Sequence, residues 1–278
     1  RLINAYEKKA DGVWFRTDWE LINDACVHCT PSLVNLYAGA MLSFNLDTPL
    51  DDVYQRWISE GLYSPMKTAS QPQIPEHPSN PEAWKYFRDF MKASWKAFSK
   101  IGYVLGHQYL ESDQAPYTIE KAFEVMVVIH SRDDWDPGAS SRVSVTKENM
   151  EKIFAEKQEG IKETKAILGI LSPDTLGLSE SFCSDIKASI QGMEDFAIFC
   201  DAVTRAMYLT SYAEKTHAAD DIAAAVSTEK ELRKIADDFE KRYQNTEYPY
   251  YLYSRLHPAR IRRFADNVAL HISRIGKE

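Results

Sequence analysis

The sequence predicts a mainly α protein, a helical bundle preceded by a short βα unit. Two observations support this prediction. Apolar residues recur at helical spacing in most segments after residue 80. Only one stretch, residues 13–15, has the uninterrupted large apolar side chains typical of a strand covered on both faces. At 278 residues, the chain is long enough to bury a large core.

Composition and charge narrow the class of partner. Hydrophobic residues make up 44% of the chain, and the formal net charge is −8. This negative charge argues against nonspecific binding to nucleic acid. No run approaches the ~18 apolar residues that a membrane span needs. We therefore expect neither a nucleic acid nor a membrane among the partners.

Residues 1–62 are expected to form the βα unit. Residues 1–10 have the pattern of an amphipathic helix, and the strand at 13–15 follows. Pro31 opens a second helix, which ends near residue 45. Thr48 is placed to cap a third helix that begins at Pro49. Because the chain opens inside a helical pattern, we expect the natural protein to be longer.

Residues 63–80 are predicted to be a linker or a surface loop, and residues 81–278 a helical domain. The linker is rich in proline, which interrupts regular structure. Its prolines are Pro65, Pro72, Pro75 and Pro78. Within the helical domain, the pattern Thr228–x–x–Glu231 is typical of a capping box and predicts a helix start. The remaining helices are expected near 81–100, 118–130, 147–171, 179–212 and 258–275.

The four cysteines do not suggest a disulfide framework or a zinc site. Cys183 and Cys200 fall on one predicted helix, where 17 residues at ~1.5 Å each separate them by roughly 25 Å. Cys26 and Cys29 have the spacing of a redox dithiol or half a zinc site, but the following helix begins only at Pro31. We expect two small buried loop residues here, with no metal and no cofactor. A thiol oxidoreductase remains an alternative, and the thiols favour a reducing compartment such as the cytoplasm.

The candidate substrate-binding residues follow the predicted strand. They are Arg16, Asp18, Trp19 and Glu20. In repeating βα enzymes, ligands bind at the carboxyl ends of the strands. Glycoside hydrolysis needs two carboxyl groups, and Trp19 could stack on a sugar. Surface ion pairing of the two carboxylates with Arg16 is the alternative. The spacing assigns no catalytic residue.

The segment from Asp11 to Glu60 also carries a wider pattern. The strand ends in an arginine-containing turn, and the next helix contains Asn35, Leu36, Tyr37 and Leu42. Asp47 and the pair Trp57–Ile58 follow. This pattern resembles the last βα unit of a TIM-barrel glycoside hydrolase of the family 67 α-glucuronidase type. The resemblance implies a remnant of a (β/α) barrel with a helical C-terminal domain packed on it. It also implies that the acid and base lie on earlier strands.

We therefore expect the C-terminal fragment of a carbohydrate-active barrel enzyme. Its partners would be the missing N-terminal barrel portion and a carbohydrate substrate. The helical domain would brace the barrel or mediate subunit contact in a homo-oligomer. We expect no hydrolase activity from this chain alone, because one strand end cannot place two carboxyls around a glycosidic bond. The alternative is a self-contained helical ligand-binding or protein-interaction module, with a pocket lined by Trp84, Trp95 and Tyr103.

Overall fold

The computed structural model confirms the mainly α prediction. It describes residues 2–12, 33–66, 74–108, 115–124, 131–167, 169–171, 173–243 and 256–275. The strand predicted at residues 13–15 lies outside these ranges. Within them, helices predominate, and the only named strands are two residues long. The barrel remnant therefore stays a prediction.

The chain divides into two compact units, neither of them continuous in sequence. Unit 1 comprises residues 1–93, 166–191 and 249–251. Unit 2 comprises residues 94–165, 192–248 and 252–278. The predicted division at residues 63–80 follows the sequence order, and it stays a prediction about domains.

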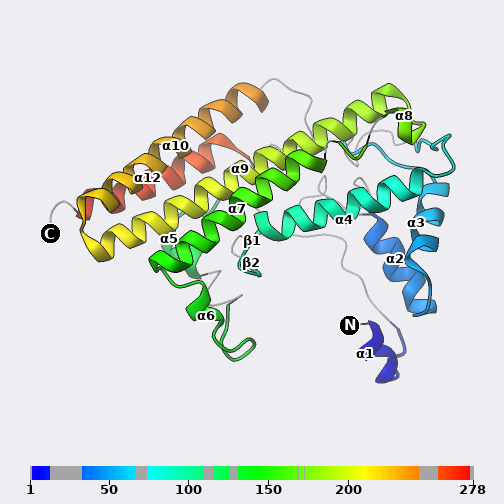
Figure 1. The fold of residues 1–278 in the computed structure, drawn as a ribbon, viewed down its shortest axis with the longest axis horizontal. Helices are drawn as coiled ribbons and strands as arrows, with labels where there is room; N and C mark the ends of the chain where they lie inside the picture. The colour runs from blue at the N-terminus through cyan, green and yellow to red at the C-terminus, as the bar shows by residue number, and fades with distance from the viewer. Residues whose placement is uncertain are drawn as a thin grey trace. The chain divides into compact units, whose positions relative to one another are not determined.

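Unit 1 is built from short helices and the beginnings of two long ones (Figure 1). Its core contains the T-shaped contact between Trp57 and Phe87, whose ring centroids are 5.7 Å apart. The helices are α1 (Leu2–Glu7), α2 (Leu33–Phe44), α3 (Leu50–Ser59), the first part of α4 (Ala83–Ile101), α8 (Pro173–Leu176) and the first part of α9 (Glu180–Thr216).

Helix α3 forms where its apolar spacing predicted it. Val53, Trp57 and Ile58 are its buried residues, and acidic residues in its first turn suit the positive end of the helix dipole. The predicted capping role of Thr48 is wrong. Pro49 occupies the cap position without a side-chain hydrogen bond, and the Thr48 hydroxyl donates to the Asn45 carbonyl at 2.7 Å.

The described part of the 63–80 segment packs on unit 1 itself. Leu62 and Glu76 form an isolated antiparallel bridge. Ser64 is buried, and its hydroxyl donates to Asp185 on α9. Gly61 precedes this segment with a φ of +90°, and a Cβ there would lie 2.8 Å from the Cβ of Pro75. Only glycine fits this turn, so the sequence at 61 fixes how the segment leaves α3.

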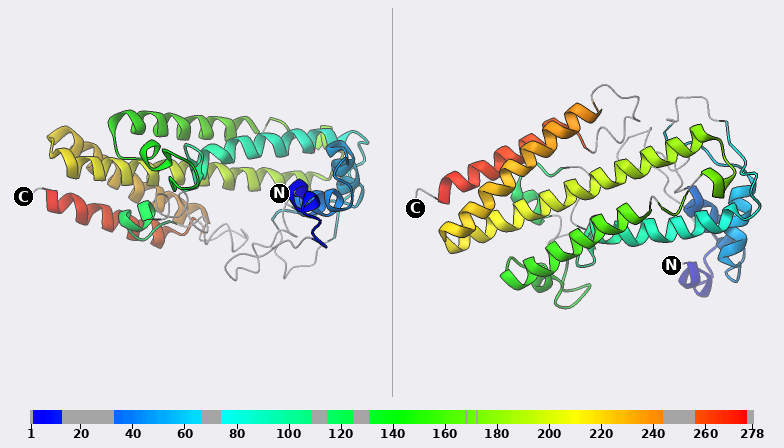
Figure 2. Two further views of the ribbon diagram at one scale, coloured as in Figure 1. Left: turned by 90° about the horizontal axis from the view of Figure 1, so that it is seen from below. Right: turned by 45° about the horizontal axis from the view of Figure 1, so that its top comes forward.

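Unit 2 contains the longer helices and a small hairpin. After the end of α4 come β1 (Tyr103–Val104), β2 (His107–Gln108), α5 (Ile119–Phe123), α6 (Ala139–Arg142), α7 (Lys147–Ile167), the rest of α9, α10 (Ala219–Tyr243) and α12 (Pro258–Ile275). Strands β1 and β2 pair antiparallel. Helices α10 and α12 lie side by side (Figure 2) and form the most extensive helix pair in the described chain. The buried apolar side chains of this pair include Leu232, Phe239, Ile261 and Phe264.

The helix start predicted at Thr228 is wrong. Helix α10 runs unbroken from Ala219, and Thr228 is buried in its interior, where its hydroxyl donates to the Ala225 carbonyl at 2.8 Å. The real start follows His217, whose φ of +50° ends α9. A threonine can satisfy its hydroxyl on a preceding helix carbonyl as well as at a cap, so the pattern alone does not mark a helix end.

Two further sequence predictions concern helix content. Cys183 and Cys200 both lie on α9, as predicted, and both side chains are buried. Burial raises the pKa of the Cys183 thiol. Among the described helices, none has the length and apolar content that crossing a membrane requires.

Candidate functional site

The predicted substrate-binding residues lie outside the described part of the chain. Arg16, Asp18, Trp19 and Glu20 all fall within residues 13–32, as do Cys26 and Cys29. The structure therefore does not test whether these residues lie close together. Their roles stay predictions, and the candidate site is built from the elements on either side of this segment, α1 and α2.

Helix α2 is unusually apolar for its exposure. Its sequence, LVNLYAGAMLSF, has only two polar side chains, yet only Val34 and Gly39 are buried. Helix α1 has no buried residue at all. Ile3 and Tyr6 on α1 are 64% and 74% exposed, and Phe44 at the end of α2 is 95% exposed. We call Ile3, Tyr6 and Phe44 the α1–α2 surface. Large apolar groups exposed together typically mark a contact with another surface.

A cavity of about 460 Å³ opens between α1 and α2. Apolar side chains predominate along its wall, with Asp11 and Ser43 as the polar ones. The lining residues are Leu2, Ala5, Tyr6, Ala10, Asp11, Gly12, Ala40, Leu42, Ser43, Phe44 and Leu46. This volume falls within the range of small-molecule sites. The paucity of charged groups makes it a place for apolar contact rather than for acid–base chemistry.

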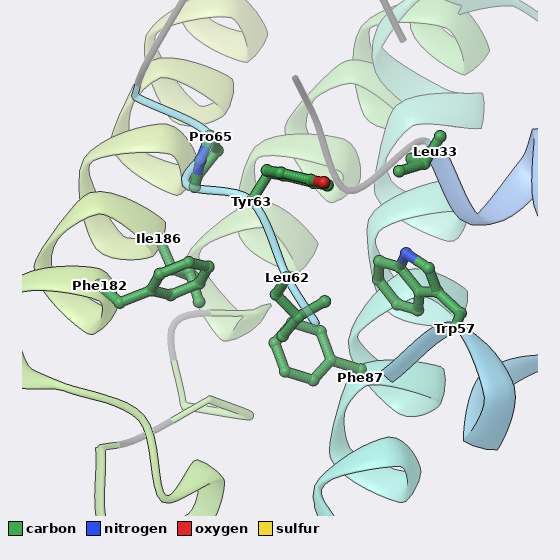
Figure 3. Close-up of a pocket in the computed structure, with 8 residues that line it drawn as sticks. All are labelled: Leu33, Trp57, Leu62, Tyr63, Pro65, Phe87, Phe182 and Ile186. Carbon is green, nitrogen blue, oxygen red and sulfur yellow. The ribbon is translucent and has the colours of Figure 1, made fainter. Parts of the chain in front are cut away.

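A second cavity in unit 1 is a packing gap. Its volume is about 10 Å³, which is about the space of one water molecule. Figure 3 shows the side chains around it, from α2, α3, α4, α9 and the segment after Gly61. They are Leu33, Trp57, Leu62, Tyr63, Pro65, Phe87, Phe182 and Ile186. A space of this size holds no substrate, so we assign it to the core.

Unit 2 holds a buried lysine that the sequence did not single out. The side chain of Lys157 on α7 is 1% exposed. Its Nζ donates to the carbonyls of Lys100, at 2.6 Å, and of Tyr103. Glu156 lies 3.5 Å from the same nitrogen and accepts from the Leu105 backbone N–H. Burial lowers the pKa of Lys157, with the Glu156 carboxylate opposing that effect.

The position of Lys157 explains what it does. The Lys100 carbonyl belongs to the last turn of α4, where backbone carbonyls lack helical partners. Lys157 thus caps α4 and ties the β1–β2 hairpin to α7. A signal was present in the sequence, because Lys157 continues the apolar stripe of Met150 and Ile153. A lysine on such a stripe indicates a buried amine with specific acceptors.

Two other polar groups in unit 2 link helices. Asp195 on α9 is 1% exposed and accepts from Arg242 and from the Tyr243 hydroxyl on α10. His271 on α12 lies between two carboxylates, with Nδ1 2.5 Å from Glu214 and Nε2 3.0 Å from Glu120. These contacts join four helices. No group of three or more possible metal ligands is present among the residues that the structure describes.

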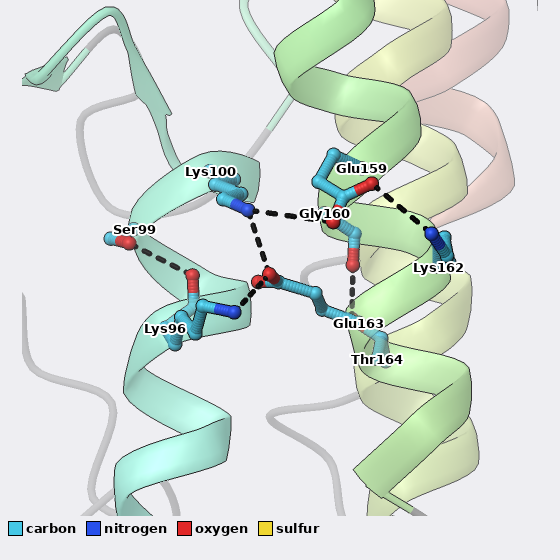
Figure 4. Close-up of polar contacts among 8 residues, drawn as sticks. All are labelled: Lys96, Ser99, Lys100, Glu159, Gly160, Lys162, Glu163 and Thr164. Atoms are coloured by element: carbon cyan, nitrogen blue, oxygen red, sulfur yellow. Dashed lines mark hydrogen bonds and ion pairs between the residues drawn. The ribbon is translucent and has the colours of Figure 1, made fainter.

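An ion-pair cluster connects α4 and α7 (Figure 4). Lys96 and Lys100 each lie 2.7 Å from the Glu163 carboxylate, whose side chain is 13% exposed. Burial opposes ionisation of Glu163, but hydrogen bonds from Lys100 and Lys96 outweigh it and lower its pKa. Close packing allows this approach, since a Cβ at Gly160 would lie 3.1 Å from Ile101. The cluster is structural.

The pocket predicted for a helical binding module is not tested by these contacts. Trp95 is 60% exposed and contacts Tyr103, with ring centroids 6.3 Å apart. Trp84 belongs to unit 1 and lies under Arg88 at 5.3 Å. Neither of the cavities described above is lined by these three aromatics.

Comparison with protein-family models, curated proteins and solved structures finds no match for this chain.

Proposed function

We propose that the chain is the C-terminal part of a carbohydrate-active, glycoside hydrolase-like barrel enzyme. In this proposal α1 and α2 are outer helices of the barrel, and the helical region braces the barrel or mediates subunit contact. The observation that carries it is the α1–α2 surface, where Tyr6 and Phe44 are 74% and 95% exposed. The resemblance of residues 11–60 to a final βα unit supports the same assignment.

The physical argument concerns what an outer barrel helix must bury. In a (β/α) barrel, each helix packs one face on the strand ring. Burying apolar surface stabilises a protein by about 25 cal/mol for each Å² removed from water. An apolar helix such as α2 therefore gains stability when a neighbour covers its exposed face. In α2, Val34 and Gly39 are buried, the leucines are half-buried, and Phe44 at its end is 95% exposed. Barrel strands are the occupant that fits a row of helices with exposed apolar faces.

The substrate contacts in this proposal are Arg16, Asp18, Trp19 and Glu20. Arg16 would donate hydrogen bonds to substrate oxygens, and Trp19 would stack on a sugar face. The acid and base would come from other strands, because two opposed carboxyls must flank the bond. The proposal names no metal or cofactor.

The test uses the full-length protein expressed from its native gene. We expect hydrolysis of aryl glycosides by the full-length protein. The variant Arg16→Ala is expected to lose about tenfold or more in kcat/KM, the effect of one charged hydrogen bond. Trp19→Ala is expected to lower kcat/KM by about tenfold through the lost stacking contact. Arg56→Ala is the matched control, because it removes the same charge from an exposed position on α3.

Two results for the native gene and its full-length product would contradict the proposal. One is a native coding region with no strand-and-helix pattern upstream of the Arg1 codon. The other is a full-length protein that hydrolyses no glycoside, or whose kcat/KM is equal in all variants. Turnover by the present chain alone would also contradict it, because the proposal places the catalytic carboxyls elsewhere.

The second candidate is a self-contained helical ligand-binding or interaction module. The exposure of Trp95 beside Tyr103 favours it, since a large exposed aromatic often anchors a partner. In that case Trp95→Ala would abolish partner binding and leave the thermal stability unchanged. Under the barrel proposal the same variant leaves kcat/KM unchanged.

A further inference from the structure

Two arginine side chains of unit 2 lie over the ring of Tyr117, which we call the aromatic platform. Tyr117, just before α5, is 43% exposed. The guanidinium carbon of Arg263 lies 4.3 Å from its ring centroid, and that of Arg260 lies 5.7 Å away. Both arginines belong to α12, where residues three apart lie on the same face. Two cationic side chains are therefore gathered over one ring.

The platform is held in place by the chain around it. Ala115 and Ile119, on either side of Tyr117, are each 3% exposed. The Ile119 backbone N–H donates to the side chain of Asn267 on α12 at 2.9 Å. Thr118 caps α5 by accepting from the Lys121 backbone N–H at 3.1 Å. Tyr117 thus has little freedom to move away from α12.

Among the residues that the structure describes, Arg260 and Arg263 differ from their neighbour Arg262 in having no carboxylate partner. Arg262, between them in sequence, pairs with Asp237 at 2.8 Å and with Glu240. Within the described residues, no ion pair is present for Arg260 or Arg263, and the first turn of α12 has no acidic residue. The nearby Glu120 carboxylate lies 3.0 Å from His271.

We propose that Arg260, Arg263 and Tyr117 form a binding site for a phosphate group, either free phosphate or that of a small monoester. A guanidinium that lies over a ring can keep its N–H edges free to donate to another acceptor. Two such edges can donate several charge-assisted hydrogen bonds to one tetrahedral oxyanion. Their two positive charges match a phosphate dianion better than a single carboxylate. This inference is independent of the proposed barrel function.

The test is an NMR titration of the whole chain, observing the arginine Nε–H resonances. Inorganic phosphate and methyl phosphate are added separately, each compared with sodium chloride at equal ionic strength. We expect saturable shifts at Arg260 and Arg263 with phosphate but not with chloride. Arg274 on the same helix, also exposed, should not shift. Equal effects of both phosphates assign recognition to the phosphate group, and an effect of inorganic phosphate alone assigns a free-phosphate site.

Variants separate a built site from general charge attraction. Arg260→Gln and Arg263→Gln should each weaken phosphate binding about tenfold or more, whereas Arg274→Gln, with the same charge change, should not. Tyr117→Phe should retain binding because the ring remains, and Tyr117→Leu should weaken it. Equal shifts with chloride, parallel shifts at Arg274, or equal weakening by all three arginine variants would overturn the proposal. Circular dichroism confirms that each variant is folded.

Discussion

Helices α2 and α12 use apolar residues in opposite ways. Helix α12 is amphipathic, with its apolar stripe of Ile261, Phe264, Val268 and Ile275 buried and arginines elsewhere. Helix α2 is apolar around most of its circumference, yet only Val34 and Gly39 are buried. The stripe of α12 finds its partner in α10. In α2, the leucines are half-buried and Phe44 is 95% exposed.

This difference shows that how apolar a helix is does not decide how much of its apolar surface is covered by the rest of the chain. An amphipathic pattern specifies one buried face, and a neighbour of the same chain can cover it. A helix that is apolar all round needs neighbours on several sides. The α1–α2 surface is therefore where we expect a further contact, and unit 2 is where we expect the stability of the isolated chain to reside.

The largest loss of stability is expected from a substitution in the core of unit 2. Phe264→Ala removes a side chain that is 0% exposed. We expect a loss of about 3–5 kcal/mol in the free energy of unfolding, from lost burial and the cavity left behind. Chemical denaturation measures it. Phe44→Ala is the matched control, and at 95% exposure it should change stability by less than about 0.5 kcal/mol. Equal losses in the two variants would mean that α2 is as closed as α12.

A smaller effect is expected from the buried carboxylate of Asp195. Asp195→Ala removes a buried hydrogen bond donated by the Tyr243 hydroxyl, while Arg242, 43% exposed, can turn to water. We expect a loss of about 1–3 kcal/mol in the free energy of unfolding. The control Asp237→Ala removes an exposed partner of Arg262 and should cost less than about 1 kcal/mol. A loss at Asp237 matching that at Asp195 would show that burial does not set the cost.

The pH dependence of stability tests the buried Lys157. Its folded pKa lies below the ordinary value of 10.5, so between those two values the unfolded chain binds more protons than the folded chain. The stability of the wild type should therefore rise with pH as the folded pKa is passed, towards 10.5. Lys157→Met should remove this rise. Denaturation at several alkaline pH values measures it, and identical slopes in the two proteins would exclude the burial effect. Exposed Lys152→Met is the control.

The smallest expected effect is at the α4–α7 cluster. Glu163→Gln removes the carboxylate shared by Lys96 and Lys100, and we expect a loss of about 0.5–1.5 kcal/mol in the free energy of unfolding. Lowering the pH should have the same effect as Glu163 is protonated, through a window below its ordinary pKa of 4.5. The control Glu148→Gln disrupts an exposed pair with Lys152 and should cost about 0.5 kcal/mol or less. No difference between the two would contradict a role for partial burial.

The local apolar pattern of the sequence was sufficient to predict the positions of many helices. The apolar spacing of α3 and α12 predicted both helices, because each buries a single stripe. The prediction that Cys183 and Cys200 fall on one helix is also confirmed, since both lie on α9. Thr228 shows where local pattern fails. Its hydroxyl bonds within the helix as readily as at an end, and packing of the surrounding stripe carries α10 through it.

Periodicity in the sequence was enough to predict the helical class and the positions of the main helices. The binding roles of Arg16, Asp18, Trp19 and Glu20 stay predictions. Only the tertiary structure decided which polar groups are buried and which apolar groups are not. Lys157 caps a distant helix, and Arg260 and Arg263 meet over Tyr117, because packing brings together residues far apart in the chain. Periodicity reports which face of a helix is apolar. It does not report what covers that face, and that depends on every other element of the fold.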